Sequence, residues 1–185
     1  MNYNNVTDLA LNFGDGEDNP SGVAEIAYFI PLSWFAVNGL KKPTASTTAA
    51  SLITISTAHV LAAGKYAIPV TPLFSKSGIN WKMAGEELSK IMEIGADIFI
   101  PDNSVKSLGT VQAIKNYRGI LLIGKADDSG HFWQIGSEKI SCKVVGGDGG
   151  TGVGPTGEVG TKMSFQSHSS QPVFVYTAGV PIPAP

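Results

Sequence analysis

Residues 117–145 read YRGILLIGKADDSGHFWQIGSEKISCKVV. Two apolar runs, 119–125 and 131–135, are separated by the acidic turn signal DDSG at 127–130. A third run, 140–144, alternates apolar and polar residues after a second turn. Short apolar or alternating runs that are bounded by turn residues are typical of consecutive antiparallel strands. This segment therefore predicts a mainly β protein.

The composition describes one domain of 185 residues that is poor in charge and rich in turn-forming residues. It contains 43% hydrophobic and 15% charged residues, with 22 glycines and 11 prolines. Such a high apolar content excludes a disordered chain. No apolar run approaches the roughly 20 residues of a membrane span. Residues 1–9 lack the basic and apolar parts of a secretory signal, so we expect synthesis in the cytoplasm and no membrane partner.

The charges argue against a protein that binds nucleic acid by neutralising phosphates. The net charge is −2 and Arg118 is the sole arginine, whereas such proteins carry clustered lysine and arginine. Cys142 is also alone, which excludes an internal disulfide and a zinc site built on cysteines. A monomer usually keeps a well-charged surface, so the shortage of charge predicts that much of this surface is covered in an assembly.

Motifs for catalysis, cofactors or metals are weak, and we expect no enzymatic activity, no cofactor and no metal ion. His59, His131 and His168 lie on separate predicted strands, so no nucleophile, base and acid converge. The glycine string within 146–157 matches a dinucleotide fingerprint, but a strand rather than a helix follows it. The acidic residues 15–19 lack the spacing of a calcium loop and are interpreted as a solvated turn.

Further strands are predicted in the first half of the chain from apolar or alternating runs at 23–30, 32–37 and 52–61. Within the last run, His59 shares its face with apolar residues, which predicts a buried histidine. Cys142, between Ile140 and Val144, is likewise expected to be a small core residue.

The alternating residues 65–74 and 79–83 are predicted to form one long, projecting hairpin. The turn signal SKSG at 75–78 separates them, and two prolines restrict the first strand to a sheet edge, since proline donates no ladder hydrogen bond. Trp81, near the tip, is interpreted as an interface anchor, because exposed aromatic hairpins usually bind something.

The rest of the chain completes the expected architecture. Residues 84–95 are compatible with a helix or a strand, and the extended residues that follow favour a strand. A helix is expected over about 102–115, capped by Asp102, Asn103 or Ser104. The glycine-rich residues 146–160 are interpreted as a long connection between two strands. The sequence thus predicts an antiparallel β-sandwich or barrel with one flanking helix and extended hairpin and loops.

The order of elements in the C-terminal half resembles the tail tube (major tail) proteins of tailed bacteriophages. The likeness rests on the strand, acidic turn and strand of residues 117–137, in which the second strand ends in aromatic-x-Ile-Gly. A strand at 140–145, a Thr-Gly loop and a last strand at 173–176 follow in the same order. The resemblance covers roughly residues 60–178 and includes the helix that precedes this pattern.

The resemblance implies a single tail-tube-like domain, 1–185, with an N-terminal arm, 1–22, and an extended C-terminal tail, 179–185. Its copies would form hexameric rings that stack into a hollow tail tube, through which DNA passes during ejection. The implied partners are copies of itself, other tail proteins and DNA contacted non-specifically in the lumen. The implied location is the tail of the virion, assembled in the host cytoplasm.

The resemblance also assigns two segments to subunit interfaces. The hairpin residues at the interface would be Tyr66, Ile68, Phe74, Ile79, Trp81 and Met83. The loop residues would be Gly147, Gly150, Gly152 and Gly157.

Two other functions remain open on the sequence alone. One is another virion structural protein, such as a neck, decoration or fibre-base domain. The other is a soluble β-sandwich module that binds carbohydrate, which would present aromatic side chains on one flat exposed face.

Overall fold

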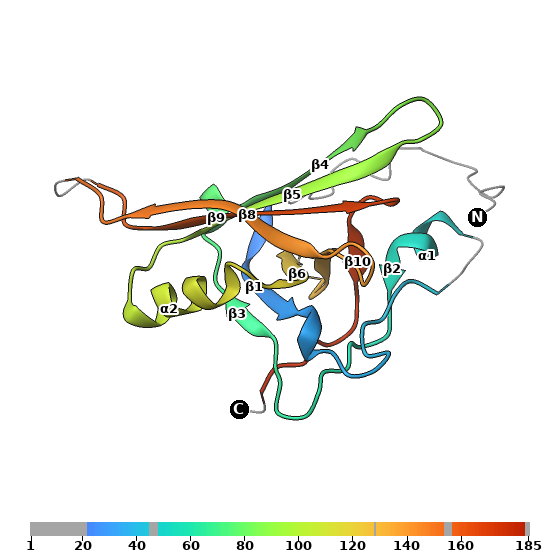
Figure 1. Ribbon diagram of the computed structural model, residues 1–185, viewed down its shortest axis with the longest axis horizontal. Helices are drawn as coiled ribbons and strands as arrows, with labels where there is room; N and C mark the ends of the chain where they lie inside the picture. The colour runs from blue at the N-terminus through green and yellow to red at the C-terminus, as the bar shows by residue number, and fades with distance from the viewer. Residues whose placement is uncertain (1–21, 45–47, 128, 154–156, 184–185) are drawn as a thin grey trace.

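Two layers of strands and a cover of loops make up the computed structural model, which describes residues 22–44, 48–127, 129–153 and 157–183 (Figure 1). The strands are β1 (Val23–Pro31), β2 (Thr54–Ile55), β3 (Ile68–Val70), β4 (Gly78–Ala84), β5 (Ile91–Ile100), β6 (Arg118–Lys125), β7 (Phe132–Ile135), β8 (Cys142–Gly150), β9 (Gly160–Ser169) and β10 (Phe174–Tyr176). The α-helices are α1 (Ala49–Ile53) and α2 (Val105–Ile114), and short 3-10 helices are η1 (Leu32–Trp34) and η2 (Phe74–Lys76). The prediction of a mainly β fold is confirmed.

The upper layer in Figure 1 is the antiparallel sheet β8-β9-β5-β4, and the remaining strands form the lower layer. Its central pair joins β5 to β9 from Met92 opposite Ser169 to Ile100 opposite Thr161. Alternate residues of these strands, such as Ile94, Ile98 and Phe165, are fully buried against the lower layer. Several neighbours on the other face, such as Glu93, Asp97 and Gln166, are polar, as expected of a sheet with one solvated side.

Strand β6 connects the two layers because it pairs with three strands. β1 lies along one edge of β6, and β7 pairs with residues 121–124 on the other. The start of β8 pairs with that same edge at Arg118 and Gly119. All ten strands therefore belong to one sheet, whose main path runs from β2 to β4 without closing into a barrel in the described residues. The sheet is mixed, since β2 and β10 are parallel.

Two apolar cores follow from the alternation along β1 and β6. Phe29, Leu121 and Ile123 face the upper layer and form the first core with β5 and β9. Ile30, Ile120 and Leu122 face the opposite side and form the second core. Partly buried side chains from the loops and from the C-terminal tail pack on this second core: Phe35, Leu40, Leu61, Ala178 and Val180. The Ala67 N–H donates to the carbonyl of Pro181 at 3.0 Å and ties the loop to the tail.

The helix expected over about 102–115 is α2, and its cap is Ser104. The Ser104 hydroxyl accepts a hydrogen bond from the Ser107 N–H at 3.2 Å, which satisfies one of the free donors in the first turn. None of the described helices has both the length and the apolar character needed to cross a membrane.

The hairpin predicted from residues 65–83 is wrong. β3 pairs with β1, η2 then turns the chain, and β4 pairs with β5 along its whole length. Proline at 69 limits β3 to three residues, so no long partner is available to β4 on that side. The actual hairpin joins β4 to β5 through 85–90, where Gly85 and Leu88 have positive φ. Residues 84–95 are therefore a turn followed by a strand, as their extended continuation favoured.

Three other expectations need correction. Most of the strand expected over 52–61 is absent, because α1 ends at Ile53 and β2 contains two residues. Hydroxyls of Ser51 and Thr54 donate to carbonyls one helical turn back, at 2.8 Å each, which stabilises the turn over a strand. The run 32–37 begins with η1, and α1 is a second helix beside the one expected.

The connection between two strands that was expected over 146–160 is present but begins later. β8 extends to Gly150 and β9 begins at Gly160, so Gly147 and Gly150 belong to the ladder, and the connection over 151–159 contains Gly152 and Gly157. These two strands extend beyond the core as an arm on the left of Figure 1. The acidic residues 15–19 and all but the last residue of the arm 1–22 lie outside the described residues. Residues 179–183, which were expected to be extended, contain no helix or strand but turn where the Ile182 N–H donates to the Val180 carbonyl at 2.9 Å, and Val180 packs on the second core.

Candidate assembly surface

The sheet β8-β9-β5-β4 has two long edges that no described strand occupies. β4 is the end of the path and pairs with β5 alone. β8 pairs with β9 through Gly150, but β6 reaches only Cys142 and Lys143 of its other edge. Residues 144–150 therefore form the second free edge. Unpaired strand edges are templates on which another strand adds.

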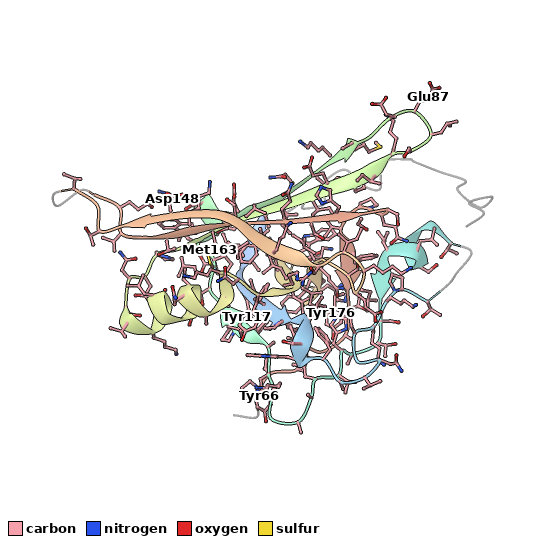
Figure 2. All side chains as sticks on the ribbon, viewed as in Figure 1. Tyr66, Glu87, Tyr117, Asp148, Met163 and Tyr176 are labelled. Carbon is pink, nitrogen blue, oxygen red and sulfur yellow. The ribbon has the colours of Figure 1, made fainter. Side chains whose placement is uncertain are left out.

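An apolar groove lies beside the free edge of β8, between the β8–β9 arm and α2. Its volume is about 570 Å³, which lies in the range of ligand pockets. Leu108 and Val111 of α2 form one wall, and Met163 of β9 lies on the other. Figure 2 shows Asp148 and Met163 on the arm above the helix.

Glycines in β8 leave this groove open. Gly147 and Gly149 are opposite Met163 and Thr161, whose side chains face the domain, so both glycines belong to the side of the arm that faces α2. A Cβ atom at Gly147 would lie 2.8 Å from the carbonyl oxygen of Lys162. A larger residue is thus disfavoured at Gly147, and the two glycines leave the groove open beside Val144, the apolar side chain of β8 that lines it.

One polar atom at the groove is buried and lacks a hydrogen-bond partner. The Asn103 side chain donates from Nδ2 to the Gly150 carbonyl at 2.7 Å, which fixes its orientation. Its Oδ1 is buried without a partner, the one such side-chain atom in the described part of the chain. Buried acceptors in native structures are nearly always paired with protein or ordered water, so this oxygen can accept from a donor that reaches the groove.

The opposite edge of the same sheet exposes large apolar side chains. Trp81 is opposite Ile94 and Met83 is opposite Met92, so both extend from the face of the sheet that is directed toward the domain. They lie beyond the core, with 51% of Trp81 and 69% of Met83 exposed. Leu88, in the β4–β5 turn, is fully exposed.

The other face of this sheet carries compensated charges. Lys82 pairs with Glu93 at 2.8 Å, and Lys162 pairs with Asp97 at 3.3 Å. Gln166 donates a further hydrogen bond to Glu93 at 2.8 Å. The hydrogen bond from Lys82 is the main reason that the pKa of Glu93 lies below its usual value. This face is polar, with each of these two lysines held by an acid.

The three histidines lie in different parts of the domain and have different surroundings. His59 is 3% exposed in the second core, where its Nε2 lies 2.8 Å from Gln134 Oε1. His168 is on the polar face, 3.8 Å from Glu93, and His131 precedes β7. The prediction that His59 is a core residue is confirmed, and so is the burial of Cys142. Among the described residues, no group of metal-ligating side chains is close enough to hold a metal ion.

The structure brings only part of the predicted interface set together. Ile79, Trp81 and Met83 share β4, whereas Ile68 lies on β3 and packs partly against the first core. Tyr66 lies in the loop cover at the far end of the domain (Figure 2), and Phe74 lies on η2. These residues do not form one patch.

The predicted loop glycines fall at two places on the arm. Gly147 and Gly150 line the groove, while Gly152 and Gly157 contact each other, since a Cβ atom on Gly152 would lie 2.7 Å from the Gly157 Cα. The sequence did not reveal Leu108 as a groove residue. Leu108 is 49% exposed although it belongs to an apolar helix, and its place in the groove depends on how α2 lies beside β8.

Comparison with protein-family models, with curated proteins and with solved structures finds no match to this chain.

Proposed function

We propose that this chain is a virion structural protein that assembles into rings, stacked as the hollow tail tube of a bacteriophage. The observation that carries the proposal is the pair of free edges on one four-stranded sheet, at β4 and β8. A chain with a free strand edge at each end of a sheet can add copies of itself indefinitely or in a closed ring.

The direction of the strands suits this form of addition. Strands alternate in direction across β8-β9-β5-β4, so β4 and β8 are antiparallel to each other. A second copy related by simple rotation places its β4 antiparallel to β8 of the first. The sheet then continues without a break in its hydrogen-bond pattern, and a suitable rotation closes it into a ring.

The two hairpins provide contacts between stacked rings in this proposal. The β4–β5 hairpin and the β8–β9 arm extend beyond the cores on opposite sides of the domain (Figure 1). Their connections carry exposed apolar side chains, Leu88 and Val153, for which the described residues offer no cover. Exposed apolar groups on projecting segments are typical of surfaces that are buried on assembly.

The polar face of the sheet would line the channel. In a closed ring the loops and cores pack on the other face, so the channel receives the side that carries Glu93, Asp97, Lys82 and Lys162. Each of these lysines is paired with an acid. Lysines that are held by acids bind phosphates more weakly than free ones do, which favours the passage of duplex DNA along this part of the face.

The full-length chain tests the proposal by light scattering on a sizing column and by negative-stain electron microscopy. We expect hexameric rings and hollow rods as the concentration rises. Rings that never stack would instead favour a neck protein of the virion. A strict monomer at high concentration, with binding on a glycan array, would reject the proposal in favour of the carbohydrate-binding module.

A further inference from the structure

We propose that the groove between α2 and β8 receives Trp81 of a second copy, whose β4 adds to the free edge of β8 in one register. This inference rests on the proposed function only in that both need copies of the chain to associate. It goes further, because it names the pocket, the side chain that fills it and the residue pairs across the joint.

The register follows from the lengths and faces of the two edges. β4 has seven residues, Gly78–Ala84, and the free edge of β8 at 144–150 is equally long. Antiparallel pairing of Gly78 with Gly150 continues as far as Lys82 opposite Gly146, because a bulge between Val144 and Gly146 interrupts β8 there. In this register Trp81 is opposite Gly147 and Ile79 is opposite Gly149.

This pairing places large side chains against glycines on the same face. Trp81 and Ile79 extend from the face of β4 that is directed toward the domain, and Gly147 and Gly149 belong to that same face of β8. An aromatic side chain opposite an edge glycine covers backbone that would otherwise be exposed. Trp81 then lies over Leu108, and the groove supplies the apolar surroundings that it lacks in the isolated chain.

The ends of the joint are complementary in charge. Arg118 and Lys143 are directly opposite each other where β6 meets β8, and both are exposed. Like charges in that position repel. In the proposed register, the turn after β4 brings Glu86 and Glu87 of the second copy to this end of β8. These exposed acids supply the anions that the basic pair needs.

The other end of the joint contains the unpaired acceptor. Asn103 Oδ1 is buried beside Gly150, where the second copy's strand begins. A backbone N–H of the added segment supplies the missing donor. The acceptor, the basic pair and the open groove are thus explained by one occupant.

Cysteine cross-linking tests the register. Asn80 and Asp148 are directly opposite in it, and both lie on the polar face of the sheet. Within one chain β5 and β9 separate them by at least about 14 Å, three times the usual strand spacing, which no disulfide spans. Under mild oxidation we expect N80C combined with D148C to cross-link copies of the chain. N80C combined with V37C, on an exposed loop residue, is the control and should not cross-link.

Side-chain variants test the pocket. W81S should keep the monomer fold, by circular dichroism, and raise the concentration needed for assembly at least about tenfold, as for a buried aromatic anchor. L108E, which adds a charge to the groove wall, should do the same. Y66S removes an aromatic side chain of similar exposure, 46%, far from both edges, and should assemble as wild type does.

The outcomes separate this inference from the proposed function. Rings that form normally in W81S, without cross-linking of N80C to D148C, would overturn the inference and leave the tube proposal standing. Cross-linked copies that never form rings or rods would support the pairing and reject the tube. A wild-type chain that neither associates nor cross-links would reject both.

Discussion

Replacement of Gln134 by leucine tests how the second core holds its buried histidine. The Lys41 N–H donates to His59 Nδ1 at 3.1 Å, so that nitrogen carries no proton. The proton is on Nε2, which donates to Gln134 Oε1 at 2.8 Å. The amide of Gln134 in turn donates to the Gly136 carbonyl at 3.3 Å. The imidazole also stacks on Tyr176 with a centroid distance of 4.6 Å.

The expected loss follows from the donor that Q134L leaves behind. Leucine fills a similar volume but accepts no hydrogen bond, so Nε2–H of His59 stays buried without a partner. Such a group costs about 1–3 kcal/mol. In a chain of this size, each kcal/mol lowers the melting temperature by about 2–4 °C. Q134L should therefore lower it by about 2–12 °C.

Urea and thermal unfolding, followed by circular dichroism at low protein concentration, measure this loss. The matched control is Q166L, which removes a glutamine amide from the polar face of β9. The control should change the free energy of unfolding by no more than about 0.5 kcal/mol. Equal losses in the two variants, or a loss below about 0.5 kcal/mol in Q134L, would refute the assignment of a stabilising buried pair.

Three further predictions concern buried groups. Burial lowers the pKa of His59 below its ordinary 6.5, so folding disfavours its protonated form. Stability should be complete above pH 6.5 and fall below it, by up to about 1.4 kcal/mol per pH unit, as measured by urea midpoints across pH. Burial raises the pKa of the Cys142 thiol, so a thiol reagent should react only after denaturation; reaction at full rate with the native chain would contradict this. G119A places a Cβ atom 2.3 Å from the Ile30 carbonyl oxygen and should lower the free energy of unfolding by about 1–3 kcal/mol. G109A has open space in α2 and should raise it by about 1 kcal/mol. A G119A variant as stable as wild type would show that β1 and β6 separate easily.

Local patterns predicted those elements whose partners are near in the sequence. The runs at 119–125 and 131–135 are β6 and β7, which pair directly across the turn that contains Asp127. The helix after Pro101 was predicted from its caps and apolar spacing, and Ser104 caps it. In these cases the hydrogen bonds that define the element connect residues close together along the chain.

The errors occurred where a distant partner selects the structure. β4 is next to β3 in the chain but pairs with β5, and β3 pairs with β1, more than 35 residues earlier. The alternation of apolar and polar residues shows which side chains share a face of a strand, but it does not show which other strand pairs with it. The exposure of Trp81 was expected from its place near a tip, whereas the groove depends on how α2 lies against β8, which neither segment encodes alone.

The cover of the second core also has a consequence for the order of events during synthesis. β2 pairs with β10, and the Thr177 hydroxyl donates to the Ile55 carbonyl across 122 residues of chain. During translation, β2 and His59 therefore leave the ribosome long before Tyr176, on which His59 stacks, has been synthesised. Until then this early segment has no completed layer to join, and such long-range contacts close slowly. We therefore expect the lower layer to form only after translation ends. Until then, β2 and the residues around His59 should stay sensitive to proteases.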